Sequence, residues 1–495
     1  MRMRSPLMVD ALRRCGAAGA PKAKSRSMRT FRFLLLGAAV TASFLTIADD
    51  RDEAPLSAGD FTVPSAGKDA YFLPSPSLSE RQREAFARGK AGFERPWVVF
   101  SVSTGDWGLG PTFVGDRCSA CHTRGGRGAP PDHPDDQPLG LVVRVSVPGS
   151  DAVGGPKTLE HYGGQMQNRA LQGQNINLLH AYAPVPAEAD LFIDWDEHIV
   201  KLADGTEVTL RKPRLRIEKP AFGDLPPDAM TSLRQASPVF GLGLLEAVPE
   251  EAILAIAERQ RALGFNGRPN FAWDAISGRQ ALGRFGLKAT QPTLRQQIAA
   301  AALHDIGATS SVFPQQNCPP VQVACRREVP GNDPELSAAA WDDLELFSLG
   351  LGVPARRNMK DPEVQRGAAL FETLQCAVCH VSALRTVDYF PRLPQLSKQT
   401  IHPYTDLLLH DMGEGLADHR PDFGAGGRDW RTPPLWGLGL SKTVNGNDAL
   451  LHDGRAQSVT EAILWHGGEA EGSNEAFRKL PKQDRVSLLR FLEAI

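Results

Sequence analysis

Cys118-Ser-Ala-Cys121-His122 and Cys376-Ala-Val-Cys379-His380 are the two stretches that decide how this chain is organised. Each is a C-x-x-C-H, the spacing at which two thiols form thioethers to one haem while the adjacent imidazole coordinates its iron. With seven Cys and twelve His in 495 residues, about 0.002 such motifs are expected by chance. Two of them therefore predict two covalently bound haem c groups.

The alternatives to haem are a zinc site and a redox-active cysteine pair that happens to precede His. Zinc needs four converging Cys or His ligands, usually from one compact unit, whereas these motifs lie 258 residues apart. Haem is the preferred interpretation. In this interpretation the thiols that form thioethers are those of Cys118, Cys121, Cys376 and Cys379, and the iron ligands are His122 and His380.

Charge and composition limit the classes of partner. The 55 Lys and Arg nearly balance the 57 Asp and Glu, so the formal charge is −2 and nothing favours nucleic acid as a partner. A hydrophobic content of 42% with 23% charged residues is ordinary for a soluble globular protein.

The N-terminus has the pattern of a secretory signal. Met28-Arg-Thr-Phe-Arg32 precedes sixteen apolar or small residues, 33–48, and an acidic stretch follows. A bilayer span needs about 20 residues, which is longer than this segment, so a cleaved signal peptide is favoured. An uncleaved membrane anchor is the alternative. Met28 is a candidate for the true start of the protein. No later segment is apolar enough to span a membrane.

Two further cysteines agree with export. Cys318 and Cys325 flank a short loop that contains Pro319-Pro320. In an oxidising compartment they are expected to form a disulfide, worth roughly 2–3 kcal/mol, although two unrelated thiols remain the alternative. Secretion, covalent haem and a local disulfide together predict the periplasm.

Local patterns place helices and strands along the chain. Apolar spacing predicts helices over 78–90, 249–263, 290–307 with Thr290 as cap, 362–374 and 481–494, and a capping box opens a further helix at Ser458-Val-Thr-Glu461. Alternation predicts strands at 142–147, 208–210 and 215–217. Residues 139–220 are thus interpreted as a β-containing insertion, and residues from about 360 to 495 as a cytochrome c-like module.

Five stretches, in order, resemble one family: Asp116-Arg-Cys-Ser-Ala-Cys-His-Thr-Arg-Gly-Gly126, Val239-Phe-Gly-Leu-Gly-Leu-Leu-Glu-Ala-Val-Pro249, Gly283-Arg-Phe-Gly-Leu-Lys-Ala289, Tyr404-Thr-Asp-Leu-Leu-Leu-His-Asp-Met-Gly-Glu-Gly-Leu-Ala-Asp418 and Leu451-His-Asp-Gly-Arg455. The chain is similar to the dihaem oxidoreductases, a family also called dihaem peroxidases or "thiol oxidoreductases". It is more distantly similar to the bacterial dihaem cytochrome c peroxidases. The resemblance runs from about residue 95 to the end.

The resemblance implies a mainly α fold, with two cytochrome c-like haem domains and a β-containing insertion between them. The expected division is a signal peptide (1–48), a leader (49–78), the first part of the N-terminal haem domain (79–138), the insertion (139–220), the rest of the N-terminal domain with a peroxide pocket (221–355) and a C-terminal cytochrome c domain (356–495).

The peroxidase relatives imply different roles for the two haems. One keeps an iron position open for hydrogen peroxide, and the C-terminal one supplies electrons through His/Met ligation. Met412 falls where that Met ligand is expected, and a thioether ligand raises the potential as an electron relay requires. His410 is the competing ligand, and a core-filling Met412 is the structural alternative.

A proton-transferring pocket is expected at the N-terminal haem. The relatives use a Gln and a downstream carboxylate, and Gln297 and Asp305 occupy that place. They are eight residues apart, about two helical turns, so both can face one pocket. The relatives carry Glu where this chain has Asp305, His304 is a rival base, and Asp305 as a simple helix end is equally open.

Three features depart from the relatives or stay open. Leu287 stands where the family usually has Trp, which puts an aromatic electron bridge there in doubt. Calcium is possible but unsupported, because Asn447-Asp448-Ala449-Leu450-Leu451 replaces the expected Thr-x-Pro before His452, which is expected near a haem. For the sixth ligand of the first haem the insertion offers His161, Met166, His180 and His198, and none is preferred.

The leading functional hypothesis is a periplasmic dihaem oxidoreductase of peroxidase type. It would reduce hydrogen peroxide, or use it to oxidise a substrate, with electrons from a small redox protein or a quinol-chain donor. The alternative is a dihaem electron-transfer cytochrome without catalytic activity.

Overall fold

The computed structural model describes residues 56–99, 107–171, 175–177, 180–181, 184–327 and 333–495. The predicted signal peptide, 1–48, and the first residues of the predicted leader lie outside these ranges. Within the described ranges, none of the helices combines the length and apolar character that a bilayer crossing demands.

The helices are mostly short, and long loops join them. They are α1 (Glu80–Glu94), α2 (Cys118–Cys121), α3 (Leu242–Glu246), α4 (Glu250–Ala262), α5 (Leu294–Ala301), α6 (Val323–Arg327), α7 (Ala338–Gly350), α8 (Pro362–Thr373), α9 (Ser441–Asn445), α10 (Val459–Leu464), α11 (Glu471–Lys479) and α12 (Lys482–Ala494).

The strands pair into several small sheets. A three-stranded sheet has the order β10 (Met230–Gln235), β3 (Leu141–Ser150) and β4 (Pro156–Lys157). The two-stranded pairs are β1 (Thr62–Val63) with β13 (Val353–Pro354), β2 (Thr112–Phe113) with β5 (Arg169–Ala170), β6 (Asn175–Asn177) with β7 (His180–Ala181), β8 (Asp190–Lys201) with β9 (Glu207–Glu218), β11 (Phe271–Asp274) with β12 (Arg279–Leu282), β14 (Leu384–Arg385) with β15 (Thr400–Ile401), and β16 (Leu409–Asp411) with β17 (Asp429–Arg431).

The prediction of a mainly α fold of two cytochrome c-like domains with one β-containing insertion is wrong. Helix makes up 32% and strand 19%, spread over many small sheets. Pairs such as β11–β12, β14–β15 and β16–β17 lie well outside residues 139–220. Pairings of two to four residues carry too little alternation to be recognised locally, because the partner strand supplies their stability. The boundaries of the proposed domains stay a prediction.

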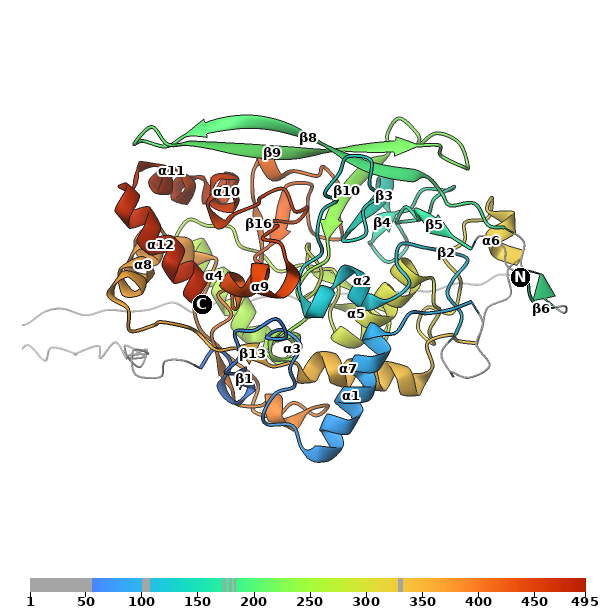
Figure 1. Ribbon diagram of the computed structural model, residues 1–495, viewed down its shortest axis with the longest axis horizontal. Coiled ribbons are helices and arrows are strands. Elements are labelled where there is room, and N and C mark those ends of the chain that lie inside the picture. The colour runs from blue at the N-terminus through green and yellow to red at the C-terminus, as the bar shows by residue number, and fades with distance from the viewer. Residues whose placement is uncertain (1–55, 100–106, 172–174, 178–179, 182–183, 328–332) are drawn as a thin grey trace, which may run out of the picture. The chain divides into compact units, whose positions relative to one another are not determined.

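Two helix crossings support the two motifs in the same way. Helix α1 packs on α7 and α8 packs on α12 (Figure 1). Each crossing needs a glycine: a Cβ on Gly89 in α1 would lie 2.0 Å from Asp343 O, and one on Gly367 in α8 would lie 2.0 Å from Ser487 O. The backbones therefore approach more closely than any side chain allows.

Local signals set the ends of these helices. Ser79 and Gln82 form a capping box at α1, and Asp361 caps α8 with Pro362 in its first turn. The predicted cap at Thr290 is wrong, because the side chain of Thr293 accepts the hydrogen bond from Gln296 N that opens α5. The predicted cap at Ser458 is confirmed.

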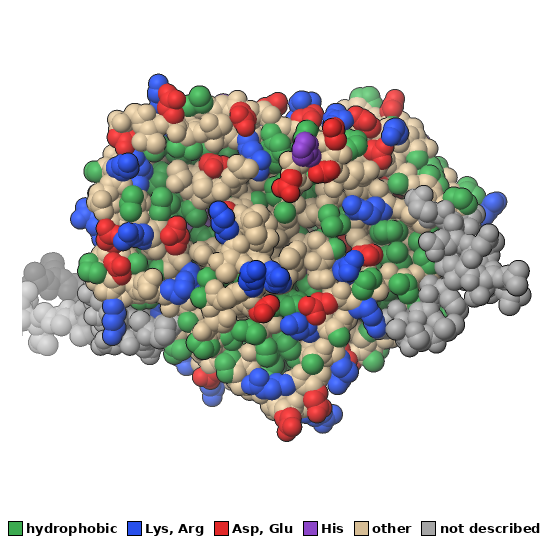
Figure 2. Space-filling view, in the orientation of Figure 1, with side chains coloured by type: hydrophobic (Ala, Val, Ile, Leu, Met, Phe, Trp, Pro, Cys, Tyr) green, Lys and Arg blue, Asp and Glu red, His purple; other side chains and the backbone are tan. Residues whose placement is uncertain are grey.

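A long antiparallel ribbon, β8–β9, runs along the top of Figure 1 above α10 and α11. His198 on β8 meets the ring of Trp465 edge-on with centroids 5.3 Å apart. The predicted disulfide between Cys318 and Cys325 is confirmed. On the face in Figure 2, Lys and Arg are interspersed with Asp and Glu, consistent with the net charge of −2.

Candidate dihaem site

One cavity connects the two C-x-x-C-H motifs. It has a volume of about 640 Å³, and Cys118, Cys121 and His122 line it together with Cys376, Cys379 and His380. Residues 258 positions apart in the sequence thus share one internal space.

The first motif forms the short helix α2 and turns His122 into the cavity. The ring Nδ1–H of His122 donates to Ser237 O at 2.7 Å, which leaves Nε2 as the nitrogen free for a ligand. Burial lowers the pKa of His122, so the imidazole is neutral, as metal ligation requires.

The second motif repeats this arrangement. Cys376–Val378 form a 3-10 helix, and His380 Nδ1–H donates to Tyr404 O at 2.9 Å. Burial, together with a smaller effect of His466, lowers the pKa of His380 to about 4. A backbone carbonyl on Nδ1 fixes the tautomer and orientation of an axial histidine.

Each of the two imidazoles has a phenylalanine ring beside it. Phe93 on α1 lies with its ring centroid 6.1 Å from His122, and Phe371 on α8 lies 6.2 Å from His380. Each Phe follows the close-packed glycine of its helix by four residues, as Gly89 to Phe93 and Gly367 to Phe371. This Gly-x-x-x-Phe signal is visible in the sequence, but only the structure shows that it belongs to both motifs.

The residues present fit two haem groups. Cys118, Cys121, Cys376 and Cys379 carry no disulfide. Burial raises the pKa of Cys118, Cys121 and Cys376 to about 12, so none is an activated thiolate. Free thiol pairs beside a neutral, oriented imidazole in one large cavity match the requirements of haem attachment.

A polar wall lies on the side of the first motif. Gln297 on α5 and Asp305 both line the cavity, as the helical spacing predicted. The helix widens into a π-helical turn, Ala302–Ile306, before Gly307 ends it, and such turns recur at functional sites. Asp305 Oδ1 accepts a hydrogen bond from Gln165 Nε2 at 2.9 Å, and burial raises the pKa of Asp305.

The rival base, His304, lines the same wall. Burial, together with the smaller effect of the positive charge of Arg144, lowers its pKa to about 3. Its ring Nδ1 has no hydrogen-bond partner among the described residues. A neutral imidazole with so low a pKa is a weak proton acceptor.

On the side of the second motif, the structure separates Met412 from its competitor. Met412 lines the cavity, whereas His410 is held by two carboxylates, with Nε2 2.8 Å from Asp406 and Nδ1 3.0 Å from Glu469. Although burial opposes it, these hydrogen bonds, with one from Cys379, raise the pKa of His410 to about 12. Both ring nitrogens of His410 are engaged, so neither is left for iron.

His466 is a candidate ligand that the sequence did not single out. It follows α10 and lines the cavity, and its Nδ1–H donates to Ala462 O at 2.7 Å. His466 thus shows the same imidazole arrangement as His122 and His380, and it lowers the pKa of His380. The capping box at Ser458 predicted the helix that precedes His466. That His466 lies on the cavity wall could be seen only in the folded structure.

The departure at Leu287 is partly offset by a tryptophan from another segment. Arg431 N donates to Leu287 O at 2.9 Å, which brings the preceding Trp430 of β17 to the cavity wall beside Leu287. The ring of Trp430 stacks on His452, with centroids 3.7 Å apart and planes 11° from parallel. His452 also lines the cavity.

Three of the four candidates in the predicted insertion do not line this cavity. His161 donates to Phe222 O, Met166 is fully buried in an apolar cluster, and His198 contacts Trp465; none of the three lines the cavity. The side chain of His180 lies outside the described residues. Asn447 and Asp448, near the position where calcium was considered, belong to no metal-ligand cluster within the described residues.

Comparison with known proteins agrees with this site. A search of curated proteins and a search of solved structures found no match. A family model described as "Di-haem oxidoreductase, putative peroxidase" matches residues 52–495. A family with two haems accounts for two C-x-x-C-H motifs on one cavity, and the chain therefore belongs to the di-haem oxidoreductase family.

Proposed function

We propose that this protein is a c-type dihaem oxidoreductase that reduces hydrogen peroxide, or uses it to oxidise a substrate. The observation that carries the proposal is the shared cavity, on which two free cysteine pairs and two oriented imidazoles meet a buried carboxylate. When bound, haem supplies the iron-centred redox chemistry that no side chain here provides.

Asp305 and Gln297 handle the peroxide in this proposal. Breaking the O–O bond to give two waters takes two electrons and two protons, and it requires a proton to move from one oxygen to the other. Asp305 accepts and returns that proton, and the raised pKa brings it closer to the working pH. Gln297 lines the same wall, and its amide N–H groups orient the peroxide.

The side of the second motif is proposed to relay electrons. Met412 was expected as its far-side ligand, and His466 is the second candidate. His466 is favoured because it lies near His380 and already has Nδ1 engaged, as an axial histidine does. Either side chain would serve as a ligand of the second haem when it is bound, and the first side would leave room for peroxide.

Location and partners follow from the same chemistry. Haem attachment and the Cys318–Cys325 disulfide favour the periplasm, with the N-terminal signal removed and no membrane span left. A small redox protein or a quinol-chain donor supplies the electrons, and hydrogen peroxide is the small-molecule substrate.

The test is electron paramagnetic resonance of the full chain, made in cells with cytochrome c assembly machinery. We expect a mass increase of two haems, one low-spin closed haem, one haem that binds added ligands, and turnover with hydrogen peroxide. The replacements Cys118→Ala and Cys376→Ala should each weaken attachment at their own motif only.

The electron-transfer alternative gives a different result. A carrier would have two closed haems and would not respond to peroxide, and that result would overturn the peroxidase proposal while leaving haem attachment intact. A mature protein without haem would overturn both.

A further inference from the structure

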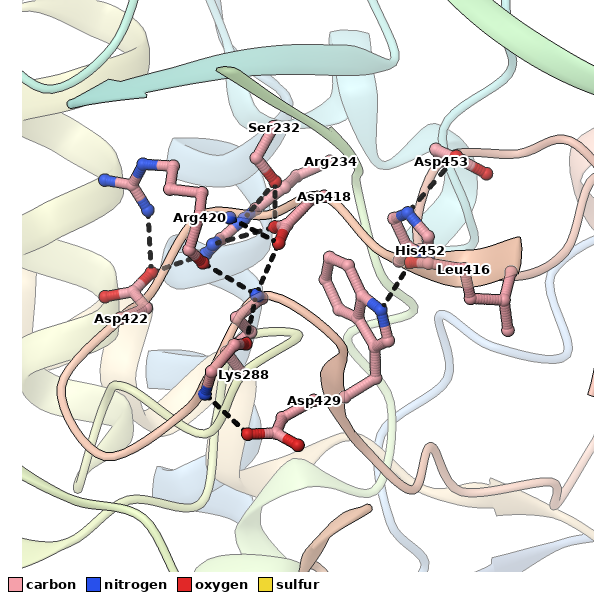
Figure 3. Close-up of polar contacts among 12 residues, drawn as sticks. Ser232, Arg234, Lys288, Leu416, Asp418, Arg420, Asp422, Asp429, His452 and Asp453 are labelled. Atoms are coloured by element: carbon pink, nitrogen blue, oxygen red, sulfur yellow. Dashed lines mark hydrogen bonds and ion pairs between the residues drawn. The ribbon is translucent and has the colours of Figure 1, made fainter. Parts of the chain in front are cut away.

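A group of basic side chains, of which Arg234 and Arg420 are buried and Arg144 is half-buried, lines the cavity on the Asp305 side. Arg144 comes from β3, Arg234 from β10 and Arg420 from the loop after Leu416. Arg234 and Arg420 are 8% and 4% exposed, and both donate to the same oxygen, Oδ2 of Asp422, at 2.9 and 3.1 Å. Figure 3 shows this convergence on Asp422.

The hydrogen bonds within the group leave donors unused. Arg234 Nη2 and Arg420 Nε are buried and have no hydrogen-bond partner in the part of the chain that the structure describes. The guanidinium of Arg144 lines the cavity and interacts electrostatically with Asp305, Arg234 and Asp422. A buried guanidinium N–H without an acceptor is costly, so an acceptor from outside the chain is expected here.

The charges of the group do not balance. Four cationic side chains meet three carboxylates: Arg144, Arg234, Lys288 and Arg420 against Asp305, Asp418 and Asp422. Lys288 is fully buried and holds Asp418 at 2.7 Å. With all three carboxylates ionised, one positive charge of the group remains uncompensated.

We propose that Arg144, Arg234 and Arg420 form a carboxylate-binding site in the wall of the cavity. A carboxylate suits the site because guanidinium groups offer parallel N–H donors that match its two oxygens. The carboxylate has two available sources: a propionate of the haem at the first motif, or a free carboxylate molecule that reaches the Asp305 side. The first source rests on the proposed haem attachment, and the second does not.

The test uses the two-haem protein and the replacement Arg144→Leu. Arg144 is the member without a direct carboxylate partner, so the Asp422 and Asp418 ion pairs survive its loss. Arg144→Lys keeps the charge and removes the fork of donors. Arg261→Leu, on the exposed end of α4, is the matched control. Mass spectrometry first establishes that each variant carries both haems.

Two measurements separate the sources. Resonance Raman spectra report the bending bands of the haem propionates, and optical titration with benzoate reports binding of a free carboxylate. A propionate source predicts a band shift in Arg144→Leu, with partial recovery in Arg144→Lys and no saturable benzoate binding. A free carboxylate predicts unchanged bands, with benzoate bound by the parent protein and roughly 10- to 100-fold more weakly by Arg144→Leu.

Either pattern supports the site. Two results would overturn the proposed carboxylate site. The first is unchanged propionate bands with no benzoate binding by the parent protein. The second is unchanged bands with equal benzoate binding by the parent, Arg144→Leu and Arg261→Leu. A parent protein that carries no haem, or that does not turn over peroxide, would instead count against the proposed function. Haem content and peroxide turnover are each measured separately from carboxylate binding.

Discussion

The His122 and His380 sides of the cavity hold their imidazoles alike but surround them with different walls. Both histidines donate Nδ1–H to a backbone carbonyl and both have a Phe near the ring. Beyond that, the first side has the carboxylate of Asp305 and the guanidinium of Arg144, whereas the second has the thioether of Met412 and the imidazole of His466.

This difference indicates a division of labour. A carboxylate and an amide can move and orient protons, and a buried cation stabilises negative charge. A thioether or imidazole ligand closes an iron site and sets its potential. The contrast is consistent with the proposal that peroxide reacts on the first side and that the second side relays electrons.

The largest effect should come from Asp305→Asn. It removes the proposed proton acceptor, and we expect peroxide turnover to fall roughly 100- to 10,000-fold, with the spectrum of the second haem unchanged. Steady-state kinetics measures it, with exposed Asp388→Asn as the control. If Asp305→Asn turned over peroxide within a few-fold of the parent rate, the proposed proton-transfer role of Asp305 would be wrong.

The second prediction concerns the far-side ligand at His380. His466→Ala should convert the second haem from low-spin to a form that binds added ligands, while Met412→Leu leaves it low-spin. Electron paramagnetic resonance of both variants gives the answer. The opposite pattern would restore the sequence-based assignment of Met412.

A third prediction tests whether the two helix crossings are equivalent. Gly89→Ala and Gly367→Ala each place a Cβ 2.0 Å from a backbone oxygen, so each should lower the free energy of unfolding by about 2–3 kcal/mol. Gly472→Ala, in α11 with nothing within 4 Å, should instead raise it by about 0.5–1 kcal/mol. Chemical denaturation followed by circular dichroism compares them; equal stability of all three variants would contradict the close packing.

The smallest expected effect is on the pH dependence of stability, through the hydrogen bonds that link Glu188 to the His304 segment. Glu188 accepts from Gln167 N, and Gln167 Nε2 donates to His304 O. Burial raises the pKa of Glu188 to about 8, so the folded state binds more protons than the unfolded state. Stability should therefore fall as pH rises from about 5 towards 8.

Glu188→Gln should remove this part of the pH dependence. Relative to the parent protein, the variant should gain roughly 1–2 kcal/mol between pH 5 and 7, because one pKa unit corresponds to about 1.4 kcal/mol. Denaturation midpoints at several pH values measure the gain. Parallel curves for the two proteins would show that Glu188 is already ionised at pH 5.

Recognition from sequence succeeded where a short local pattern carries the chemistry. The two C-x-x-C-H motifs, the Cys318–Cys325 pair and the family resemblance needed no knowledge of distant contacts. It failed on fold class, because short strands such as β14 and β16 exist only through their partners. It also passed over His466, whose importance depends on lying near His380.

The sequence by itself determined the family and located the two C-x-x-C-H motifs, because thioether attachment of haem depends on the spacing of a few neighbouring residues. Only the tertiary structure decided that both motifs open into one cavity, and that Arg144, Arg234 and Arg420 converge beside Asp305. Those relations join residues between 71 and 276 positions apart in the sequence. Burial and charge act through space rather than along the chain.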